Sequence, residues 1–367
     1  MRELTVITVA AASLAAFPAV GLTAEWRGVD LSYVNELEDC GAEYRLDGAA
    51  RAPFDLLADA GANIVRLRLW HSPDWTRYST LDDVKTSIRR ARAAGMRVLL
   101  DFHYSDDWAH PGKQLRPAAW RQAADVDELA ALLSGYTREV LAELDREGLL
   151  PDVVATGNEI NTDMLVDDEV AEDHPIDWSR NIVIVNAALE AVHSIDYESG
   201  PAPKRMLHIA QPENVVPWFD AAIDAGLGEF EIIGLSYYPK WSWVPFAALE
   251  ARLREIHSRF GKDLVVVETA YPWTLEGNDE ASNLLGEDSL APGYPASVDG
   301  QGRFLDDLQD AVVRAGGLGT VYWEPAWVSS DCSTRWGEGS HWENAALFDF
   351  DGELLESARY LADETPD

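Results

Sequence analysis

Cysteine, lysine and long apolar runs are scarce in this 367-residue chain, and each scarcity argues against a class of protein. The two cysteines, Cys40 and Cys332, stand outside any C-x-x-C spacing, so a zinc or redox motif has little support. Lysine occurs five times, and 29 basic residues face 64 acidic ones, which leaves a net charge of −35. Because phosphate contacts need Lys and Arg, neither nucleic acid nor an anionic membrane is an expected partner.

This acidity instead favours an uncharged partner. It also suits a protein that stays hydrated in salty surroundings, where screening relieves self-repulsion. The ordinary acidic bias of a secreted protein is the alternative. Several catalytic motifs are absent as well: there is no H-x-H, H-E-x-x-H or G-x-S-x-G, and no G-x-G-x-x-G follows a strand-like run. Metal-dependent hydrolysis is therefore disfavoured.

The one long apolar stretch lies at the N-terminus. Arg2 precedes a run rich in Ala and Val over residues 6–22, and Leu22-Thr23-Ala24 resembles a cleavage site. We expect residues 1–24 to be a signal peptide that sends the protein out of the cell or into the periplasm. A buried first helix is the alternative, but Pro18 and Gly21 would interrupt it. No later run approaches the ~20 apolar residues of a membrane span.

Strand-like and helix-like segments alternate through the rest of the chain. Strands are predicted at residues 28–31, 64–70, 98–102, 153–155, 206–209, 232–238, 264–267 and 319–323. Amphipathic helices are predicted at residues 52–60, 81–94, 126–147, 182–195, 217–225, 246–259, 301–315 and 354–361. Glycine stop signals follow six of them, at Gly61, Gly95, Gly148, Gly226, Gly261 and Gly316. Eight such units predict an α/β fold, a (β/α)8 TIM barrel that forms a single domain over residues 25–367.

The segments that follow the strands are long, which places the elaborated loops on the C-terminal face of the barrel. Examples are residues 104–125, 158–178, 271–299 and 324–352. Cys40 follows the first strand and Cys332 the last, and these two strands are neighbours where a barrel closes. In an exported chain, this pair predicts one disulfide that pins the last loop over the cleft.

Two glutamates occupy the positions where barrels carry out chemistry. Glu159 ends the string Thr-Gly-Asn-Glu at 156–159, and Glu268 lies in Val-Val-Glu-Thr at 266–269. A carboxylate at the C-terminal tip of a barrel strand points into the mouth. Two of them can act on one glycosidic bond as acid/base and nucleophile, ~5–5.5 Å apart if the enzyme retains configuration. For either glutamate alone, a strand-end salt bridge is the alternative.

Further polar residues share faces of the neighbouring strands. Alternation places Arg66 and Arg68 on one face, and likewise Asp101 and His103. A guanidinium beside a catalytic carboxylate keeps it ionised, and a structural salt bridge is a compatible alternative. His103 either hydrogen-bonds near the nucleophile or to a sugar hydroxyl, or is a satisfied barrel histidine.

Tryptophan is concentrated at the same end of the barrel. Ten of the fourteen lie at or just after predicted strand ends: Trp70, Trp75, Trp108, Trp241, Trp243, Trp273, Trp323, Trp327, Trp336 and Trp342. Sugar rings stack their C–H faces on aromatic planes, so a cleft lined with tryptophan suits a polysaccharide. Any one of them can instead be a core residue or a loop anchor.

Seven strings together resemble one family. They are Gly-Val-Asp-Leu-Ser (28–32), Arg-Leu-Arg-Leu-Trp (66–70), Asp-Phe-His-Tyr-Ser-Asp (101–106), Gly-Asn-Glu-Ile-Asn (157–161), Gly-Leu-Ser-Tyr-Tyr-Pro (234–239), Val-Glu-Thr-Ala-Tyr (267–271) and Tyr-Trp-Glu-Pro-Ala-Trp (322–327). The chain is similar to the arabinogalactan endo-β-1,4-galactanases, glycoside hydrolase family 53 in a barrel clan of retaining enzymes. The resemblance covers nearly all of the chain after residue 24.

The resemblance implies roles for matching residues. Glu159 would be the general acid/base and Glu268 the nucleophile, held ionised by Arg68, while Asn158 would hydrogen-bond the sugar 2-OH. Tyr238 would orient the nucleophile, and Trp323 would form the floor of the −1 subsite. The full set of expected substrate-binding residues is Arg68, Asp101, His103, Trp108, Asn158, Tyr238, Trp273, Trp323 and Trp327.

The chemistry needs no cofactor, but the resemblance raises a structural calcium ion. Some bacterial members bind calcium after the seventh strand with the pattern Asp-x-Asp-x-His-x-Asn. Here Asp279 and Asn283 match that pattern, whereas Gly277 and Ala281 replace its first Asp and its His. Asp279 and Asn283 therefore remain the candidate calcium ligands, since Ca²⁺ accepts carboxylate and amide oxygens.

The expected function is that of a secreted retaining hydrolase that cleaves internal bonds of β-1,4-galactan or type I arabinogalactan. One alternative is another retaining β-1,4-glycanase of the same clan, such as a mannanase or cellulase. A non-catalytic carbohydrate-binding barrel is the other, and the presence of both glutamates and Asn158 argues against it.

Overall fold

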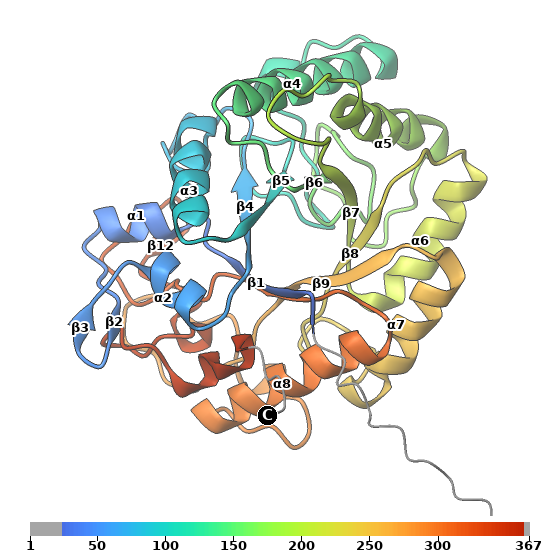
Figure 1. Ribbon diagram of the computed structural model, residues 1–367. Helices are drawn as coiled ribbons and strands as arrows, with labels where there is room; N and C mark the ends of the chain where they lie inside the picture. The colour runs from blue at the N-terminus through green and yellow to red at the C-terminus, as the bar shows by residue number, and fades with distance from the viewer. Residues whose placement is uncertain (1–23, 363–367) are drawn as a thin grey trace, which may run out of the picture.

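The computed structural model describes residues 24–362, so the expected signal peptide lies outside the described residues except for Ala24. Eight parallel strands close into a barrel in the order β1-β10-β9-β8-β7-β6-β5-β4, and the helices surround it (Figure 1). The strands are β1 (Trp26–Asp30), β4 (Ile64–Leu69), β5 (Arg97–Phe102), β6 (Val153–Thr156), β7 (Lys204–Ala210), β8 (Ile232–Ser236), β9 (Asp263–Thr269) and β10 (Gly319–Tyr322). The predicted (β/α)8 barrel is confirmed.

Eight α-helices cover the barrel. They are α1 (Val34–Asp39), α2 (Pro53–Asp59), α3 (Leu81–Ala93), α4 (Val126–Arg146), α5 (Trp178–His193), α6 (Pro212–Asp224), α7 (Phe246–Phe260) and α8 (Val298–Arg314). Short hairpins β2–β3 (Arg45–Leu46, Ala49–Ala50) and β11–β12 (Ser333–Thr334, Gly337–Glu338) decorate the loops. Among residues 24–362, no helix has both the length and the apolar character needed to cross a bilayer.

Three helix predictions need correction. The segment predicted as a helix at 354–361 is a 3₁₀ helix, Glu356–Leu361, and α1 was not predicted because its six residues are too few to show a periodicity. Helix α6 begins at Pro212 rather than at residue 217. Proline is favourable in the first turn of a helix, because the N–H that it lacks would have no partner within the helix there. The glycine stop at Gly261 is confirmed, with a left-handed φ of 61° at the end of α7.

Strand alternation builds two apolar layers around the barrel wall. Inward side chains fill the lower interior: Trp26, Ile64, Leu99, Val153, Ala155, Met206, Ile232, Val265, Val267 and Val321. Outward side chains such as Leu67 and Leu100 join the larger core beneath the helices. Above the inner apolar layer, the interior positions become polar, and they face the mouth formed by the C-terminal ends of the strands.

One disulfide ties the first unit of the barrel to the last. Cys40 follows α1 and Cys332 lies in the loop after β10, with their Cα atoms 5.4 Å apart. The two strands that lead into these segments, β1 and β10, pair directly where the barrel closes. The pairing expected from the sequence is therefore present in the structure.

Candidate active site

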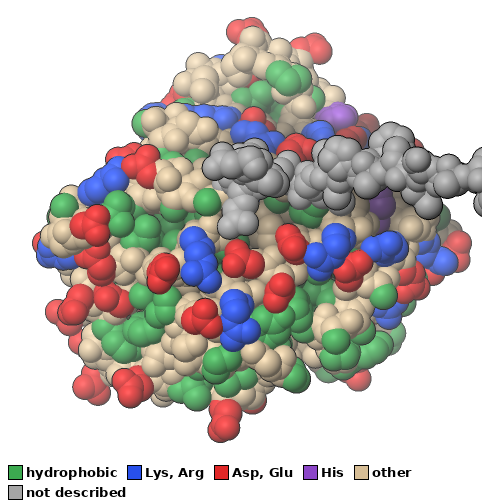
Figure 2. Space-filling model, turned by 60° about the horizontal axis from the view of Figure 1, so that its bottom comes forward, with side chains coloured by type: hydrophobic (Ala, Val, Ile, Leu, Met, Phe, Trp, Pro, Cys, Tyr) green, Lys and Arg blue, Asp and Glu red, His purple; other side chains and the backbone are tan. Residues whose placement is uncertain are grey.

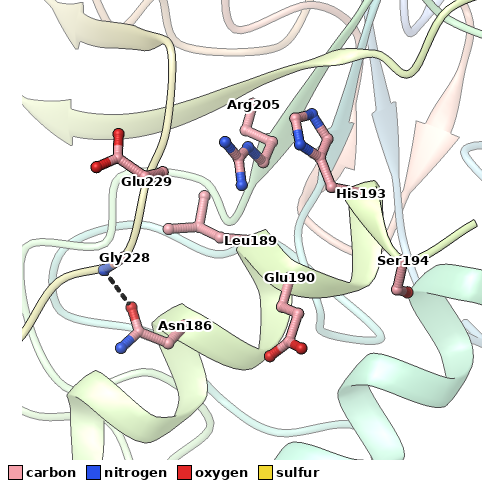
Figure 3. Close-up of a pocket in the computed structure, with 8 residues that line it drawn as sticks. All are labelled: Asn186, Leu189, Glu190, His193, Ser194, Arg205, Gly228 and Glu229. Atoms are coloured by element: carbon pink, nitrogen blue, oxygen red, sulfur yellow. Dashed lines mark hydrogen bonds between the residues drawn. The ribbon is translucent and has the colours of Figure 1, made fainter.

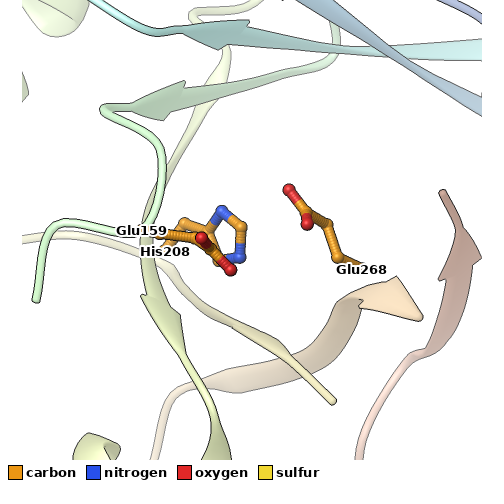
Figure 4. A group of neighbouring side chains, drawn as sticks. All are labelled: Glu159, His208 and Glu268. Carbon is orange, nitrogen blue, oxygen red and sulfur yellow. The ribbon is translucent and has the colours of Figure 1, made fainter. Parts of the chain in front are cut away.

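Two glutamates meet at the C-terminal mouth of the barrel. Glu159 follows β6 and Glu268 lies near the end of β9. One oxygen of each carboxyl group and a ring nitrogen of His208 all lie within 4.8 Å of one another. In Figure 4, Glu268 points towards Glu159 and His208 from the opposite side of the barrel. The two carboxylates singled out in the sequence are thus brought together.

Unusual backbone presents both of these side chains. Gly157 has a φ of 110°, and a Cβ atom there would lie 2.6 Å from Cγ2 of Ile160. The turn continues into a left-handed φ of 46° at Glu159 itself. On the other side, the register of β9 shifts by one residue against both β8 and β10 near Val267. Such a bulge re-aims the next side chain, so Glu268 enters the mouth although Val267 also faces the interior.

Arg66 is the cation that contacts Glu268. Its Nη2 atom lies 2.7 Å from Oε1 of Glu268 and 2.6 Å from Oδ2 of Asp101, and its Nη1 atom lies 2.6 Å from Oδ2 of Asp30. The expectation that Arg68 would hold Glu268 ionised is therefore wrong. Both arginines face inward as predicted, but Arg68 stands one pleat nearer the rim and is out of reach.

Arg68 instead forms the centre of a buried cluster. Its Nη1 atom lies 3.3 Å from Oε1 of Glu324, a fully buried carboxyl group. Its guanidinium also lies over three aromatic rings, 4.1 Å from the centroid of Trp108, 4.5 Å from Tyr33 and 4.7 Å from Trp70. Arg68 therefore supports the aromatic wall of the mouth rather than the nucleophile.

Asp101 and His103 lie behind the site as a connected pair. Nε2 of His103 lies 3.2 Å from Oδ2 of Asp101, and its Nδ1 accepts a hydrogen bond of 3.1 Å from the amide of Ala109. Burial lowers the pKa of His103, so the ring is neutral, and Asp101 in turn contacts Arg66. Nδ1 is thus satisfied within the barrel, whereas Nε2 has only the close contact with Asp101 and no hydrogen bond. The substrate-binding role of His103 stays a prediction.

Tyr238 and Asn158 contact the two glutamates or their partners. The hydroxyl of Tyr238 donates to Oε2 of Glu268 at 3.2 Å. Oδ1 of Asn158 accepts from Arg66 at 2.7 Å, and its Nδ2 donates to the carbonyl of Ala109 at 2.8 Å. The amide of Asn158 is thereby fixed in one orientation.

Two residues of the site escaped prediction, His208 and Ser236. His208 is completely buried and lies 2.9 Å from Asn158 Oδ1 through Nδ1 and 2.9 Å from Ser236 Oγ through Nε2. Ser236 lies 2.5 Å from Oε1 of Glu159. Alternation along β7 from Met206, and along β8 from Ile232, would have placed both on the inner face.

Burial raises the pKa of both glutamates above the ordinary range. Arg66 opposes this shift, chiefly at Glu268, where the contact is direct. Two carboxylates this close cannot both ionise readily, so the pair holds a proton around neutral pH. Glu268 has a guanidinium and a phenol as donors, whereas Glu159 has one hydroxyl, so the proton belongs on Glu159.

An unbroken band of aromatic rings crosses the mouth. We call it the aromatic band, and its members in order of contact are Trp75, Trp336, Trp108, Trp323, Trp342, Tyr238 and Trp241. Successive ring centroids are 4.7–6.2 Å apart. Trp336 and Trp241, towards its two ends, are 38% and 46% exposed, so the band opens to solvent on both sides of Tyr238.

Two other predicted binding residues, Trp327 and Trp273, are not members of the aromatic band. Trp327 is buried and packs on Tyr33, with ring centroids 4.3 Å apart, so it supports Trp323 from below. Trp273 packs on Phe350 at 4.8 Å, and its Nε1 donates to the carbonyl of Glu343. Both contacts make Trp273 an anchor for the loop after β10.

The candidate calcium ligands are occupied by hydrogen-bond donors. Oδ2 of Asp279 accepts from the amide of Ser340 at 2.6 Å, and its Oδ1 accepts from the amide of Ala281 at 2.9 Å. Oδ1 of Asn283 faces the amide of Asn344 at 3.5 Å. A shell of N–H donors does not fit a cation that requires six to eight oxygen ligands.

The group of Glu159, His208 and Glu268 is the only described set of three that is close enough to share a metal ion. Arg66 contacts Glu268 there, and its positive charge opposes a second cation. The hollow shown in Figure 3 is not part of this site, since it lies between α5 and the loop before β8. Its lining includes Arg205 at the start of β7, on the opposite end of the barrel from the glutamates.

A closed (β/α)8 barrel with two adjacent glutamates and an aromatic band at its C-terminal mouth defines a glycoside hydrolase of the barrel class. The family model for Glycosyl hydrolase family 53 matches residues 26–361, and the chain belongs to this family. It is 48% identical over 322 residues to an arabinogalactan endo-β-1,4-galactanase from Cellvibrio japonicus, covering 88% of this chain and 86% of the relative. It is 30% identical to an endo-β-1,4-galactanase from Bacillus subtilis, covering 90% and 84%.

A solved structure of a family 53 catalytic domain from Ignisphaera aggregans superposes with a TM-score of 0.84 at 32% identity. The match covers 94% of this chain and 97% of that domain. The family resemblance stated on seven short strings is thereby confirmed over the whole barrel.

Proposed function

We propose that the protein is a retaining endo-β-1,4-galactanase that cleaves internal bonds of galactan or type I arabinogalactan. The observation that carries the proposal is the Glu159–Glu268 pair, whose oxygens lie within 4.8 Å of each other in a barrel of this family. Retaining glycosidases place these groups ~5–5.5 Å apart, whereas inverting enzymes need ~6.5–9.5 Å to admit a water molecule. The short spacing supports double displacement.

The two glutamates would divide the reaction between them. Ionised Glu268 attacks the anomeric carbon while Glu159 gives its proton to the leaving oxygen, which yields a galactosyl ester on Glu268. Glu159 then takes a proton from water, and the hydroxide releases the sugar and regenerates both groups. Arg66 and Tyr238 would position Glu268, and the second hydrogen of Asn158 Nδ2, whose first hydrogen bonds to the Ala109 carbonyl, would meet the sugar 2-OH.

The substrate assignment rests on relatives and on charge. Both curated relatives described above are named as β-1,4-galactanases, and galactan is an uncharged polymer that a chain with a net charge of −35 does not repel. The aromatic band supports cutting within a chain, because stacking surfaces extend to either side of the glutamates. Trp323, in the middle of the band, would floor the −1 subsite.

We also propose that the protein is exported. A disulfide between Cys40 and Cys332 persists in an oxidising compartment, and the N-terminal run has the pattern of a signal peptide. Mass spectrometry of the protein from the culture medium would test this, since export by this route predicts a mature N-terminus near residue 25.

Activity on linear β-1,4-galactan, with β-mannan and cellulose in parallel, tests the enzymatic proposal. We expect mixed galacto-oligosaccharides early in the reaction, and proton NMR should detect the β-anomer of the products first. Activity on mannan or cellulose instead would identify another glycanase of the clan. No release of reducing ends from any of the three would indicate a carbohydrate-binding barrel, and an α-anomer formed first would overturn retention.

A further inference from the structure

A chain of hydrogen bonds joins Glu159 to Asn158, the residue whose amide group is fixed in one orientation. It runs from Asn158 to His208 at 2.9 Å, from His208 to Ser236 at 2.9 Å, and from Ser236 to Glu159 at 2.5 Å. His208 and Ser236 are fully buried and lie on β7 and β8. Counting the protons along this chain determines which way each bond points.

The direction is set at Asn158. Its Nδ2 faces the carbonyl oxygen of Ala109, which can only accept, and its Oδ1 faces the guanidinium of Arg66, which can only donate. Oδ1 is therefore an acceptor, and the neighbouring Nδ1 of His208 must carry a hydrogen to bond with it.

The other nitrogen of His208 is then an acceptor. Burial, with the positive charge of Arg66 as a second cause, lowers the pKa of His208 well below its ordinary value, so the ring is neutral and has one N–H. Nε2 of His208 thus presents a lone pair to Ser236. The serine has a single proton, for which Nε2 of His208 competes with an ionised Glu159.

While the serine proton is directed to Nε2, Oγ of Ser236 can only accept from a protonated Glu159; donation to an ionised Glu159 requires that the bond to His208 breaks. Resting on the proposed role of Glu159 as general acid, we propose that the Asn158–His208–Ser236 chain holds Glu159 in its protonated form before each turnover. His208 and Ser236 are positioning residues, since they act through Glu159, and Asn158 orients His208 in addition to its proposed contact with the sugar. When Glu159 has given up its proton, the serine hydroxyl rotates towards the carboxylate and breaks its bond with His208. The next proton, taken from water, restores the original orientation.

Other charges also act on Glu159. The groups that face it are Arg66 on β4, Asp101 on β5, Glu172 in the loop after β6, His208 on β7, Tyr238 in the loop after β8 and Glu268 on β9. The three carboxylates favour the protonated form of Glu159, and Arg66 opposes it. All of these groups except His208 remain in place in the variants below, and His208 is replaced by a neutral amide in both, so a difference between those variants isolates the chain.

The unaltered protein supplies the first test. Nitrogen-15 NMR of the histidine rings, with the His208 signals assigned by substitution, reports which ring nitrogen carries the hydrogen. We expect a neutral ring with the hydrogen on Nδ1 between pH 5 and pH 8. A hydrogen on Nε2 would reverse the chain and overturn the proposal.

Two matched substitutions provide the second test. In His208→Asn, the new amide nitrogen replaces Nδ1 but nothing reaches Ser236, whose hydroxyl becomes free to stabilise ionised Glu159. In His208→Gln, the amide oxygen replaces Nε2 and keeps the serine proton occupied. Because a hydrogen bond to a charged group is worth about one pKa unit, the pKa of Glu159 should fall by about one unit in His208→Asn. It should stay near its wild-type value in His208→Gln.

Carbon-13 NMR of labelled glutamate carboxyl groups measures this pKa without substrate, with Glu159→Gln identifying the signal. Circular dichroism establishes that both variants fold, and the basic limb of galactan hydrolysis should move with the measured pKa. Equal pKa values in the two variants would overturn the proposed chain even in an active galactanase. Wild-type protein that cleaves no galactan would contradict the proposed function, and the carboxyl titration would still decide the state of Glu159.

Discussion

At the scale of single residues, the site is short of positive charge. Asp30, Asp101 and Glu268 each contact Arg66 within 2.7 Å, so one guanidinium serves three carboxylates before Glu159 is counted. An ionised Glu159 would add a fourth negative charge nearby. This imbalance favours one proton on the pair of glutamates, which the proposed step requires because Glu159 protonates the leaving oxygen while ionised Glu268 attacks.

Replacing Glu268 by alanine should abolish turnover and spare binding. The substitution removes the carboxylate proposed to form the covalent intermediate, while Asp30 and Asp101 still satisfy Arg66. We expect kcat on galactan to fall by roughly 10³-fold or more. Titration calorimetry should still detect galacto-oligosaccharide binding. Activity within tenfold of the wild type, in a folded variant, would rule out the nucleophile assignment.

The loss of rate on replacing Glu159 by alanine should depend on the leaving group of the substrate. Aryl galactosides with acidic phenols need little protonation, so their first step should be spared relative to galactan. The wild-type rate should be lost as pH rises through the pKa of Glu159, which burial raises, because the acid must be protonated. That basic limb should disappear in the variant. An equal loss on both kinds of substrate would contradict the acid/base role.

The error at Arg68 shows what alternation along a strand can and cannot predict. Period two put Arg66 and Arg68 on the same inner face, but the choice between them depends on height along the barrel axis. That height depends on the stagger between the strand of the arginines and the strand of Glu268, which cannot be read from the sequences of the two strands. The bulge that turns Glu268 inward is similarly invisible, because it adds one residue to β9 without a Gly or Pro.

At the scale of elements, two acids interlock the loops after β9 and β10, the buried Glu343 and the partly exposed Asp279. Glu343, which is 1% exposed, accepts at Oε1 from the amide of Asn278 at 2.6 Å, and at Oε2 from the hydroxyl of Ser329. Asp279 reaches in the opposite direction, to the amide of Ser340. The sequence indicated long loops on this face, but not these contacts, because irregular loops have no periodicity to read.

Charge at Glu343, rather than calcium, should therefore hold these loops. Treatment with EDTA should change neither the melting temperature nor the activity, measured by calorimetry and sugar release. Glu343→Gln should lower the melting temperature by a few degrees, because hydrogen bonds to a carboxylate become weaker bonds to a neutral amide, at a cost of about 1–3 kcal/mol. Glu280→Gln, at an exposed position in the same loop, is the control. Destabilisation by EDTA that added Ca²⁺ reverses would contradict this account.

The exposed rings of the aromatic band should contribute to binding of the polymer. Trp336→Ala and Trp241→Ala should each raise KM for galactan about 5-fold, because loss of one stacking surface costs about 1 kcal/mol. Hydrolysis of short aryl galactosides should change less. Trp243→Ala serves as the comparison, since this ring is 73% exposed and makes no ring contact with the band. Equal effects in all three variants would contradict a continuous stacking surface.

At the scale of the whole molecule, the disulfide raises the stability of the fold and the negative net charge lowers it. The disulfide joins residues 292 positions apart, and the loop-entropy account assigns such a bridge about 6 kcal/mol of stabilisation. Against it stands the excess of acid: 64 acidic residues minus 29 basic ones leaves 35 carboxylates without a basic counterpart. Figure 2 shows acidic side chains spread over the face in view, with Lys and Arg side chains among them.

Salt should therefore stabilise this protein. Raising NaCl from 0.1 M to 1 M shortens the Debye length from about 10 Å to about 3 Å, which screens repulsion among the carboxylates. Surface ion pairs weaken as well, but each is worth at most about 1 kcal/mol, and the unpaired acids outnumber the bases. We expect the melting temperature at pH 7 to rise by several degrees across this range, measured by calorimetry. At pH 4.5, where part of the carboxylates are protonated, the same salt step should give a smaller rise. A melting temperature that falls with NaCl at pH 7 would show that the ion pairs outweigh the repulsion.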